Sequence, residues 1–419
     1  MPDLFIHNIK QLITPLQKHC SELKRTLHSI DSAAIIIENG VIKEIGKESE
    51  LKPKITANCP TLDAKDTIAL PGLIDCHTHP VYVGNRADEF HMRNAGKSYL
   101  EIAAAGGGIQ ASARNTRNAS VEQIVEESLP RFQRSLRSGV TTIEGKSGYG
   151  LEWQGEVNLL SALRVINSII PQRLERTFLV HVLPENYADK RELFCDEVIN
   201  EMIPQVVERD LATAADIFCE TGAFTVDESR RILTAAKDNG LAITIHSNQF
   251  GNSGGALLAA ELGARSADHL EYLNDAEIKA MVEAGVAGVI LPACVFFLNS
   301  IPYPPARKMI ESGMRIAIAT DCNPGTSMTE SIPFSMTTAA IYCKMTPEEL
   351  LWAVTLDAAR VLGRDTQIGS LEAGKLADIT LWNIPNLETL SYHFGLMEPS
   401  SVLIDGKVML SNFDESRKY

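Results

Sequence analysis

The sequence lacks several features that mark other classes of protein. It has no apolar run of about 18 residues and no basic segment followed by an apolar core, so neither a membrane span nor an export signal is expected. It has no lysine and arginine cluster, and 39 basic against 53 acidic residues give a net charge of -14. We therefore expect neither nucleic acid nor a membrane as a partner. The eight cysteines include no C-x-x-C pair, which favours reduced thiols and a cytoplasmic location.

What the sequence does contain is a regular alternation of strand-like and helix-like segments. Eight apolar runs, the first being LPGLIDCHTH and the last RIAIATDCNP, read as strands. Helix-like segments follow several of them, and their expected N-caps are Ser120, Thr225, Asn274 and Thr346. Eight such units predict an α/β protein whose residues 71–365 form a (β/α)8 TIM barrel.

The two flanks of this region have a different pattern. Residues 33–48, AAIIIENGVIKEIGKE, form two β-rich runs around an Asn39-Gly40 turn, which is a strong hairpin signal. Near the other end, GKLADITLWNIP and SVLIDGKVML also read as strands. Residues 1–70 and 366–419 are therefore expected to build one small β-sandwich domain from both termini, with the barrel inserted between them.

Six polar side chains fall at the ends of predicted barrel strands. They are His77 and His79 after the first strand, His181 after the third, His246 after the fifth, His269 after the sixth and Asp321 after the eighth. Any one of them alone could be an ordinary packing or loop residue. Together they open onto one face of the barrel, where barrel enzymes carry their chemistry, and so they predict an active site.

Four of these residues have the composition of a metal site. The imidazoles of His77, His79 and His246 with the carboxylate of Asp321 suit zinc or iron, and we expect one such ion per chain with water in a further position. An ion of this kind activates water and polarises an attacked carbonyl, which is hydrolytic chemistry. His269 and Asp321 are both candidates for the general base, and the sequence leaves that choice open.

Longer stretches resemble a known family. HTH, IHSNQ, ADHLE and ATDCNPGT resemble the amidohydrolase superfamily, and GNRA, KSGYGL and DCNPGT resemble its imidazolonepropionase family across residues 33–410. HSNQF and VHVLPENY depart from the HADQ-like and AHALP-like segments common there. The resemblance implies a homodimeric, metal-dependent hydrolase that catalyses the third step of histidine degradation. In this step the cyclic amide C–N bond of 4-imidazolone-5-propanoate is opened to give N-formimidoyl-L-glutamate.

The same resemblance implies how an anionic substrate is held. It implies that Arg86 binds the propionate carboxylate of the substrate. The alternative is that Arg86 forms a surface ion pair with Asp88 or Glu89. Hydrogen bonds to the substrate or the water are expected from a further set of side chains: Tyr149, Tyr99, His181 and Gln249. Asn323, Gly325 and Thr326 are expected to contact the opened product.

Lys146 raises a rival interpretation, because some amidohydrolases bridge two metals with a carbamylated lysine at the fourth strand. Here Lys146 follows the second predicted strand and the fourth ends in Phe218, Cys219 and Glu220, which favours a single metal. We expect Lys146 to hold the SGYG loop, or else to be a surface charge.

Two other functions remain open from the sequence. A related deaminase of a heterocyclic amine would use the same ligands, but it would need no cationic clamp for a carboxylate. A non-enzymatic protein on a decayed barrel is expected to have lost metal ligands, whereas all four are present here.

Overall fold

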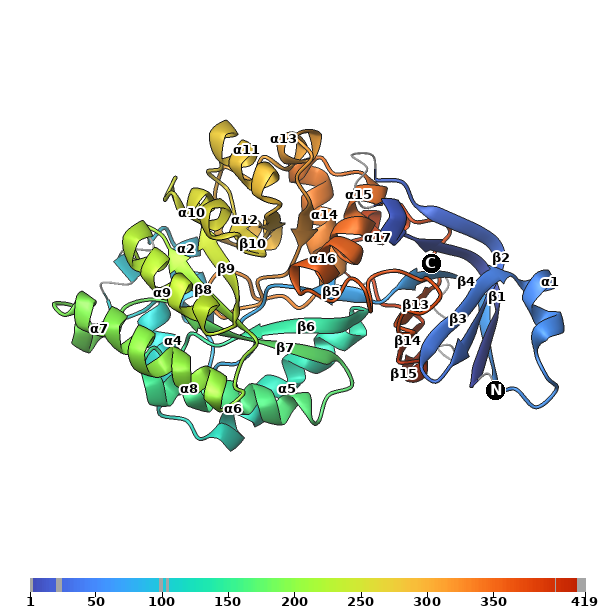
Figure 1. Cartoon of the computed structure of the whole chain (residues 1–419), viewed down its shortest axis with the longest axis horizontal. Coiled ribbons are helices and arrows are strands. Elements are labelled where there is room, and N and C mark those ends of the chain that lie inside the picture. The colour runs from blue at the N-terminus through green and yellow to red at the C-terminus, as the bar shows by residue number, and fades with distance from the viewer. Residues whose placement is uncertain (1–2, 20–24, 98–100, 103–104, 396, 413–419) are drawn as a thin grey trace.

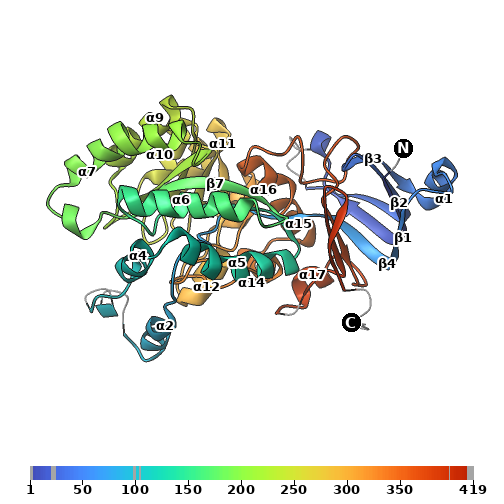
Figure 2. The same cartoon turned by 90° about the horizontal axis from the view of Figure 1, so that it is seen from below.

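The computed structural model describes residues 3–19, 25–97, 101–102, 105–395 and 397–412. These residues form an eight-stranded sheet and a separate seven-stranded sheet. Figures 1 and 2 show a helix-covered barrel beside the sheet that both termini build. The predicted (β/α)8 barrel with a terminal β-sandwich is confirmed. None of the helices in the described part has the length and apolar character needed to cross a membrane.

The barrel strands are parallel and pair in chain order. Most are buried on both faces, as expected for strands with a packed barrel inside and helices outside. They are β5 (Leu73–Asp75), β6 (Val140–Lys146), β7 (Arg173–Val180), β8 (Ala214–Cys219), β9 (Ala242–Ser247), β10 (Ser266–His269), β11 (Ala287–Ile290) and β12 (Ile316–Ile318).

Helices surround these strands, and each predicted N-cap side chain accepts a hydrogen bond from a backbone N–H of its first turn. The helices are α2 (Ala87–Asn94), α4 (Ile109–Arg117), α5 (Val121–Arg137), α6 (Trp153–Asn167), α7 (Arg191–Glu197), α8 (Ile203–Glu208), α9 (Val226–Asp238), α10 (Gly255–Leu262), α11 (Asp275–Ala284), α12 (Pro292–Leu298), α13 (Ala306–Glu311), α14 (Ile332–Cys343), α15 (Pro347–Ala353) and α16 (Leu356–Val361).

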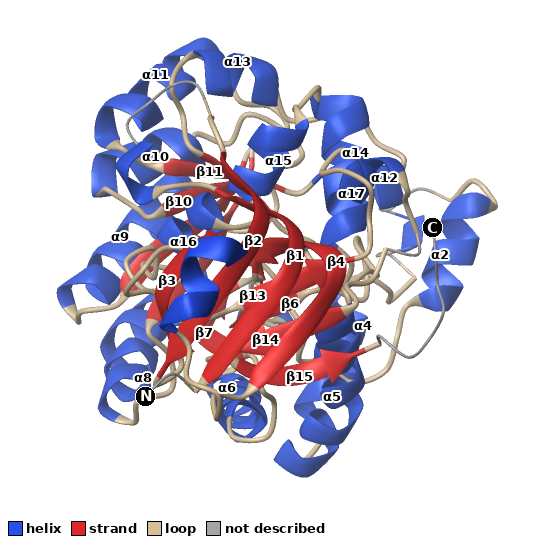
Figure 3. Cartoon of the chain, turned by 90° about the vertical axis from the view of Figure 1, so that its right-hand side faces the viewer, coloured by secondary structure: helices blue, strands red, loops and turns tan. Residues whose placement is uncertain are grey.

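The terminal sheet has the strand order β15-β14-β13-β4-β1-β2-β3, and Figure 3 shows it with its strands in red. The Asn39-Gly40 turn joins β2 and β3 with positive φ at both residues, as the sequence predicts for a tight hairpin. The strands are β1 (Leu4–Thr14), β2 (His28–Glu38), β3 (Val41–Lys47), β4 (Thr61–Pro71), β13 (Ile379–Trp382), β14 (Ser401–Ile404) and β15 (Lys407–Ser411), with α1 (Glu48–Leu51) and α17 (Thr389–Tyr392) beside them.

One face of the terminal sheet has its own apolar core, and the other face packs partly on α1 and partly on the barrel. The edge strand β3 is covered by residues 374–377, since Ile42 N donates to Lys375 O at 2.8 Å. Trp382 packs into the barrel core, and Arg173 at the start of β7 pairs with Asp378. The sheet therefore sits at the amino ends of the barrel strands. The domain limits at residues 70 and 365 stay a proposal, because β4 continues to Pro71.

The barrel closes between β12 and β5 through hydrogen bonds just beyond both strands. Asp321 N donates to His77 O at 3.1 Å, and His79 N donates to Cys322 O at 2.9 Å. These bonds place side chains from the first and last strands next to each other. The seam is thus part of the framework that brings the predicted ligands together.

A buried carboxylate adds to this seam. Asp75 is 1% exposed, and its two oxygens accept from Thr320 N at 3.0 Å and from Thr320 Oγ1 at 2.6 Å. Burial raises the pKa of Asp75 from 3.8 to about 7, although the bonds from Thr320 oppose that rise. The Asp75 side chain therefore links β5 to the residues after β12, although its ionisation is unfavourable in this buried position.

Replacing this carboxyl is expected to weaken the fold. Asp75→Ala leaves two buried donors of Thr320 without an acceptor and should lower the free energy of unfolding by about 2–4 kcal/mol. Because the folded-state pKa is raised, the contribution of Asp75 to stability falls as pH rises from about 4 to about 7. Asp75→Asn should cost less and remove that pH dependence. Urea unfolding at several pH values measures both effects, and equal unfolding energies for parent and Asp75→Ala would contradict the assignment.

Candidate active site

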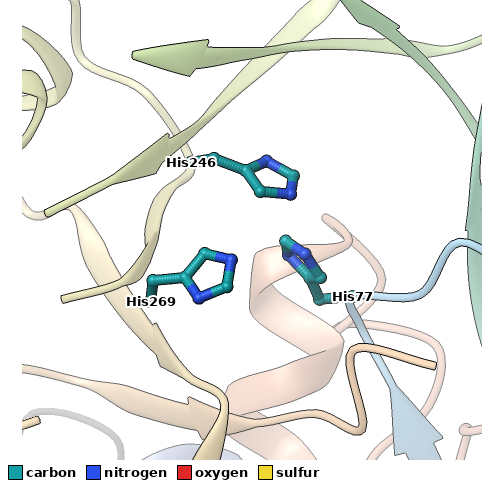
Figure 4. Close-up of side chains that lie close together, drawn as sticks. All are labelled: His77, His246 and His269. Atoms are coloured by element: carbon teal, nitrogen blue, oxygen red, sulfur yellow. The ribbon is translucent and has the colours of Figure 1, made fainter. Parts of the chain in front are cut away.

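The polar side chains predicted at the strand ends meet at the carboxyl end of the barrel. His77 and His79 follow β5, His246 lies in β9, His269 ends β10 and Asp321 follows β12. The ring centroids of His77 and His246 are 4.5 Å apart, and those of His246 and His269 are 5.3 Å apart. Figure 4 shows these three rings turned toward one another. The structure thus brings together residues separated by more than 240 positions in the chain.

Three separations among the donor atoms of the four predicted ligands are in the range expected for ligands of one ion. Asp321 Oδ1 lies 3.6 Å from His77 Nε2 and 3.3 Å from His79 Nε2, and His246 Nε2 lies 3.3 Å from His79 Nε2. Tetrahedral bonds of about 2.1 Å would separate ligand atoms by about 3.4 Å. Among the described residues, the buried His77 Nε2 has no hydrogen-bond partner. The donor set therefore fits a zinc or iron ion.

Two carboxylates orient two of these imidazoles from below. Asp268 Oδ2 accepts a 2.6 Å hydrogen bond from His77 Nδ1, and Asp216 Oδ2 lies 2.9 Å from His246 Nδ1. With a proton on each Nδ1, the lone pair on Nε2 points into the site. Burial lowers the pKa of His77 well below its usual value and that of His246 to about 4. Both rings are therefore neutral, as metal ligation requires.

The backbone turns sharply where these side chains are presented. Asn248, His269, Leu270 and Asp321 have φ values of 57°, 81°, 72° and 54°, a region that non-glycine residues rarely adopt. Such strain gathers at functional sites, where the surrounding structure overrides local preference. Here the residues with positive φ lie at or just beyond the ends of β9, β10 and β12. The chain changes direction at these residues, which carry or adjoin the functional side chains.

His269 is paired with an acidic residue that the sequence analysis did not single out. Its Nδ1 lies 3.6 Å from Glu271 Oε1, and both side chains are buried. Burial disfavours the imidazolium, but Glu271 and Asp321 outweigh this effect and raise the pKa of His269. The arrangement is suited to an imidazole that accepts a proton and is stabilised once charged.

The possible donor groups overlap. Donor atoms of His77, His79 and Asp321 lie within 4.8 Å of one another, and so do those of His77, His246 and His269. A third group joins His269, Cys294 and Asp321, and among the described residues the four predicted ligands are divided between the first two groups. Because His269 is also within ligand range, its assignment to proton transfer stays a prediction.

A cavity opens over these groups, and Arg86 is one of its walls. The Arg86 side chain is 5% exposed, and Nε and Nη2 lie 2.8 and 2.7 Å from Glu89 Oε2. The ion pair with Glu89 that we considered as an alternative therefore exists, but inside the cavity wall. A Cβ on Gly325 would lie 2.0 Å from Arg86 Nη1, so glycine is needed there. Glu89 and Gly325 together fix the guanidinium.

A buried carboxylate also anchors the loop that carries Tyr149. Glu156 accepts hydrogen bonds from Gly148 N at 2.9 Å and Gly150 N at 2.8 Å. Gly148 O lies 3.0 Å from His181 Nδ1, and the rings of Tyr149 and His181 are 5.5 Å apart. Both predicted substrate-binding side chains line the cavity. Their mutual placement is fixed before any ligand binds.

The loop after β12 is held by its own asparagine. Asn323 Oδ1 accepts from Gly325 N at 2.8 Å and Thr326 N at 2.7 Å. These N–H groups, expected to receive the product, are therefore engaged within the loop, while the side chains of Asn323 and Thr326 line the cavity. Gln249 also lines it, and its Nε2 lies 3.7 Å from Cys294 Sγ. Tyr99 lies outside the described residues.

Comparison with known proteins identifies the family. The Amidohydrolase family matches residues 68–409. The imidazolonepropionase of Geobacillus thermodenitrificans is 42% identical over 98% of this chain and 99% of its own length. That of Fusobacterium nucleatum is 42% identical over 97% of this chain and 98% of its own length. This chain belongs to the imidazolonepropionase family of amidohydrolases.

Solved structures share the fold of this imidazolonepropionase-family chain at much lower identity. A zinc-bound adenosine deaminase from Xanthomonas campestris has a TM-score of 0.73 and 20% identity, covering 98% of this chain and 93% of its own. Guanine deaminase of E. coli has a TM-score of 0.69 and 16% identity, covering 97% and 98%. At these identities the likeness concerns the fold alone.

Lys146 departs from the expectations set by the sequence. It is the last residue of β6 and fully buried, so the surface-charge alternative is wrong. Its Nζ lies 2.8 Å from Asp216 Oδ2 and 3.0 Å from Glu144 Oε1. The described anchor of the SGYG loop is Glu156 instead. The signal for this role was present as charged residues inside the apolar runs TTIEGKSG, ATAADIFC and ARSADHLE.

Proposed function

We propose that this chain hydrolyses the cyclic amide C–N bond of 4-imidazolone-5-propanoate to N-formimidoyl-L-glutamate, the third step of histidine degradation. The observation that carries this proposal is its 42% identity to imidazolonepropionases over nearly the full length of both chains. A buried cavity with a fixed guanidinium supports a small anionic substrate over a neutral heterocyclic amine. The deaminase alternative has no comparable support.

The metal is assigned to His77, His79, His246 and Asp321, with one zinc or iron ion per chain. The support is three separations of 3.3–3.6 Å among their donor atoms and the neutral state of the imidazoles of His77 and His246. When bound, the ion supplies Lewis acidity to the hydrolytic water and to the amide carbonyl. The protein side chains around it position the substrate and move the protons.

His269 is the proposed general acid and base. It takes a proton from the attacking water and returns one to the ring nitrogen that leaves as the amide C–N bond breaks. Burial raises the pKa of Asp321, but the surrounding imidazoles outweigh burial and lower this pKa below its usual value, so the Asp321 carboxylate is a weak base. His269, whose imidazolium Glu271 stabilises, is the better proton acceptor.

The remaining cavity residues hold the substrate. Arg86 binds the propionate carboxylate, which a chain of net charge -14 would otherwise repel. Tyr149 and His181 contact the ring, and Gln249 holds the ring or the attacking water. Asn323, Gly325 and Thr326 form the loop beside which the opened product lies.

The proposed setting is a homodimer in the cytoplasm. All seven described cysteines are free thiols, in keeping with a reducing compartment. The helices α12, α14 and α17 pack side by side. They leave Phe296, Ile341, Tyr342 and Tyr392 between 45% and 83% exposed. A surface of this kind suits a second copy of the chain.

Turnover separates the proposed reaction from the deaminase alternative. Freshly generated imidazolone propionate should be consumed with formation of N-formimidoyl-L-glutamate, whereas a panel of heterocyclic amines should release no ammonia. Efficient turnover of an uncharged amine, with none of the propionate, would reverse the assignment.

Metal content should be about one zinc or iron per chain, because four protein ligands complete one site. Removal of the ion with a chelator should abolish turnover, and adding zinc or iron back should restore it. Elemental analysis of fully active protein provides the count. Two equivalents, or undiminished activity in the metal-free protein, would rule out this site.

Replacement of His269 tests its assignment to proton transfer. His269→Asn should lower kcat by about a hundred- to ten-thousandfold while metal content stays near normal. Glu271→Gln should lower the pKa of His269 and move the acid limb of the pH–rate profile to lower pH, since the raised pKa depends on that carboxylate. The exposed His91→Asn is the control. Loss of the metal from folded His269→Asn protein would make His269 a ligand.

Replacement of Arg86 tests the carboxylate clamp. Arg86→Met should raise KM at least about tenfold, because a charged hydrogen-bonded pair contributes roughly 1.5–3 kcal/mol. Gly325→Ala should act in the same direction by displacing the guanidinium. Arg230→Met, which removes an arginine paired on the surface, should leave KM unchanged. A KM for Arg86→Met within twofold of the parent would exclude the clamp.

The exposed helical face tests the homodimer. Ile341→Glu places a charge on α14 and should convert the dimer to monomers in sedimentation velocity, whereas Leu193→Glu on α7 should not. A monomeric parent protein would exclude the homodimer, and an unchanged dimer of Ile341→Glu would place the interface elsewhere.

A further inference from the structure

A lysine lies beneath the candidate metal centre, away from solvent and substrate. Lys146 is fully buried, and its Nζ lies 2.8 Å from Asp216 Oδ2, 3.0 Å from Glu144 Oε1 and 3.9 Å from Asp268 Oδ2. Two of these three carboxylates are those that contact the imidazoles of His246 and His77. The cation is therefore one side chain removed from two proposed ligands.

We propose that Lys146 is a positioning residue for the metal centre, because its ammonium fixes the carboxylates that aim two ligand histidines. This inference rests on the proposed metal ligands and assigns Lys146 no contact with the metal or the substrate.

The geometry joins separate strands into one network. Lys146 extends from β6 to Asp216 on β8 and toward Asp268 on β10. Asp216 contacts His246 on β9, and Asp268 contacts His77 beyond β5. Side chains in or just beyond five of the eight barrel strands are thereby linked. A shift of the Lys146 ammonium would therefore change the orientation of two imidazoles, those of His77 and His246.

Charge balance explains why a cation is needed at this point. Glu144, Asp216 and Asp268 are each 3% exposed or less, and buried carboxylates that lack a partner are costly. Without the ammonium, Asp216 and Asp268 would repel each other and move from the positions that hold the Nδ1 atoms. The Nε2 lone pairs of His77 and His246 would then no longer point toward the same metal position.

A second electrostatic effect has the opposite sign. Removal of a positive charge near the site would, by itself, increase the affinity of the site for a metal cation. The direction of the change in metal affinity therefore separates positioning from simple charge repulsion. A carbamylated Lys146 is disfavoured by the same contacts, because a carbamate would add a further anion beside three carboxylates.

The experiment compares metal binding in three variants of the full-length protein. Lys146→Met removes the cation, and Lys146→Met/Glu144→Gln removes one cation and one anion, which keeps the buried charge balanced. Lys375→Met is the matched control, because Lys375 is also buried but lies far from the centre and donates to Asp365 O and Ile368 O. Zinc dissociation constants come from chelator competition, ligand geometry from the visible spectrum of the cobalt-substituted protein, and stability from thermal unfolding.

Both variants at position 146 should bind zinc about 10- to 100-fold more weakly and give an altered cobalt spectrum, the range typical of residues that orient metal ligands. The Lys375→Met protein should be less stable than the parent but should keep the parent's zinc affinity and cobalt spectrum. Parent-like or tighter zinc binding by Lys146→Met would overturn the proposal. If that variant does not fold, parent-like affinity and spectrum in the double variant would overturn it equally. Failure of the proposed ligand set would instead appear in the parent, as absence of zinc binding.

Discussion

An imidazole offers a metal its Nε2 lone pair when its proton lies on Nδ1, and buried carboxylates stand beside the Nδ1 atoms of two of the three proposed ligand histidines. Asp268 accepts a hydrogen bond from Nδ1 of His77, and Asp216 Oδ2 lies 2.9 Å from Nδ1 of His246. The carboxylates are themselves buried beside Lys146. Placing the four donor atoms 3.3–3.6 Å apart also needs closure of the barrel between β12 and β5. Orientation, charge and closure thus depend on one another.

Carboxylates and an amide perform a second task around the cavity, where they hold loops. Glu156 accepts backbone N–H bonds of the loop that carries Tyr149, and Asn323 does so for the loop after β12. Glu89 fixes the guanidinium of Arg86 from within the cavity wall. Glu156 of α6 thus binds the Tyr149 loop to the scaffold, whereas the loop after β12 is held by hydrogen bonds within itself. The cavity therefore has its shape before a substrate enters, which lowers the entropy cost of binding.

The sequence predicted the parts of this structure that follow from local pattern. Strand periodicity gave the barrel, capping residues gave helix starts, and the histidines and Asp321 stood at strand ends that a barrel must bring together. The sequence did not predict the partners of those residues. Glu144, Asp216 and Asp268 stand inside apolar strands, and period-two alternation does not say which inward side chains meet across a barrel. The position of Glu271 depends on the conformation of the segment after β10, which is set by tertiary contacts. The pairing of Arg86 with Glu89 was foreseen as an alternative, but on the surface, whereas both side chains are buried.

The terminal sheet has a consequence for the order in which the molecule can be completed. Strand β4 leads directly into β5, but its neighbour β13 begins 308 residues later, at Ile379, and residues 374–377 cover the edge of β3. During synthesis all four proposed ligands, the last of them Asp321, leave the ribosome before β13 exists. Through that interval β4 has an open edge, a surface to which strands of other chains can add. Nascent chains are thus exposed to wrong pairing at the sheet, which lies at the amino ends of the barrel strands and away from the candidate site at their carboxyl ends.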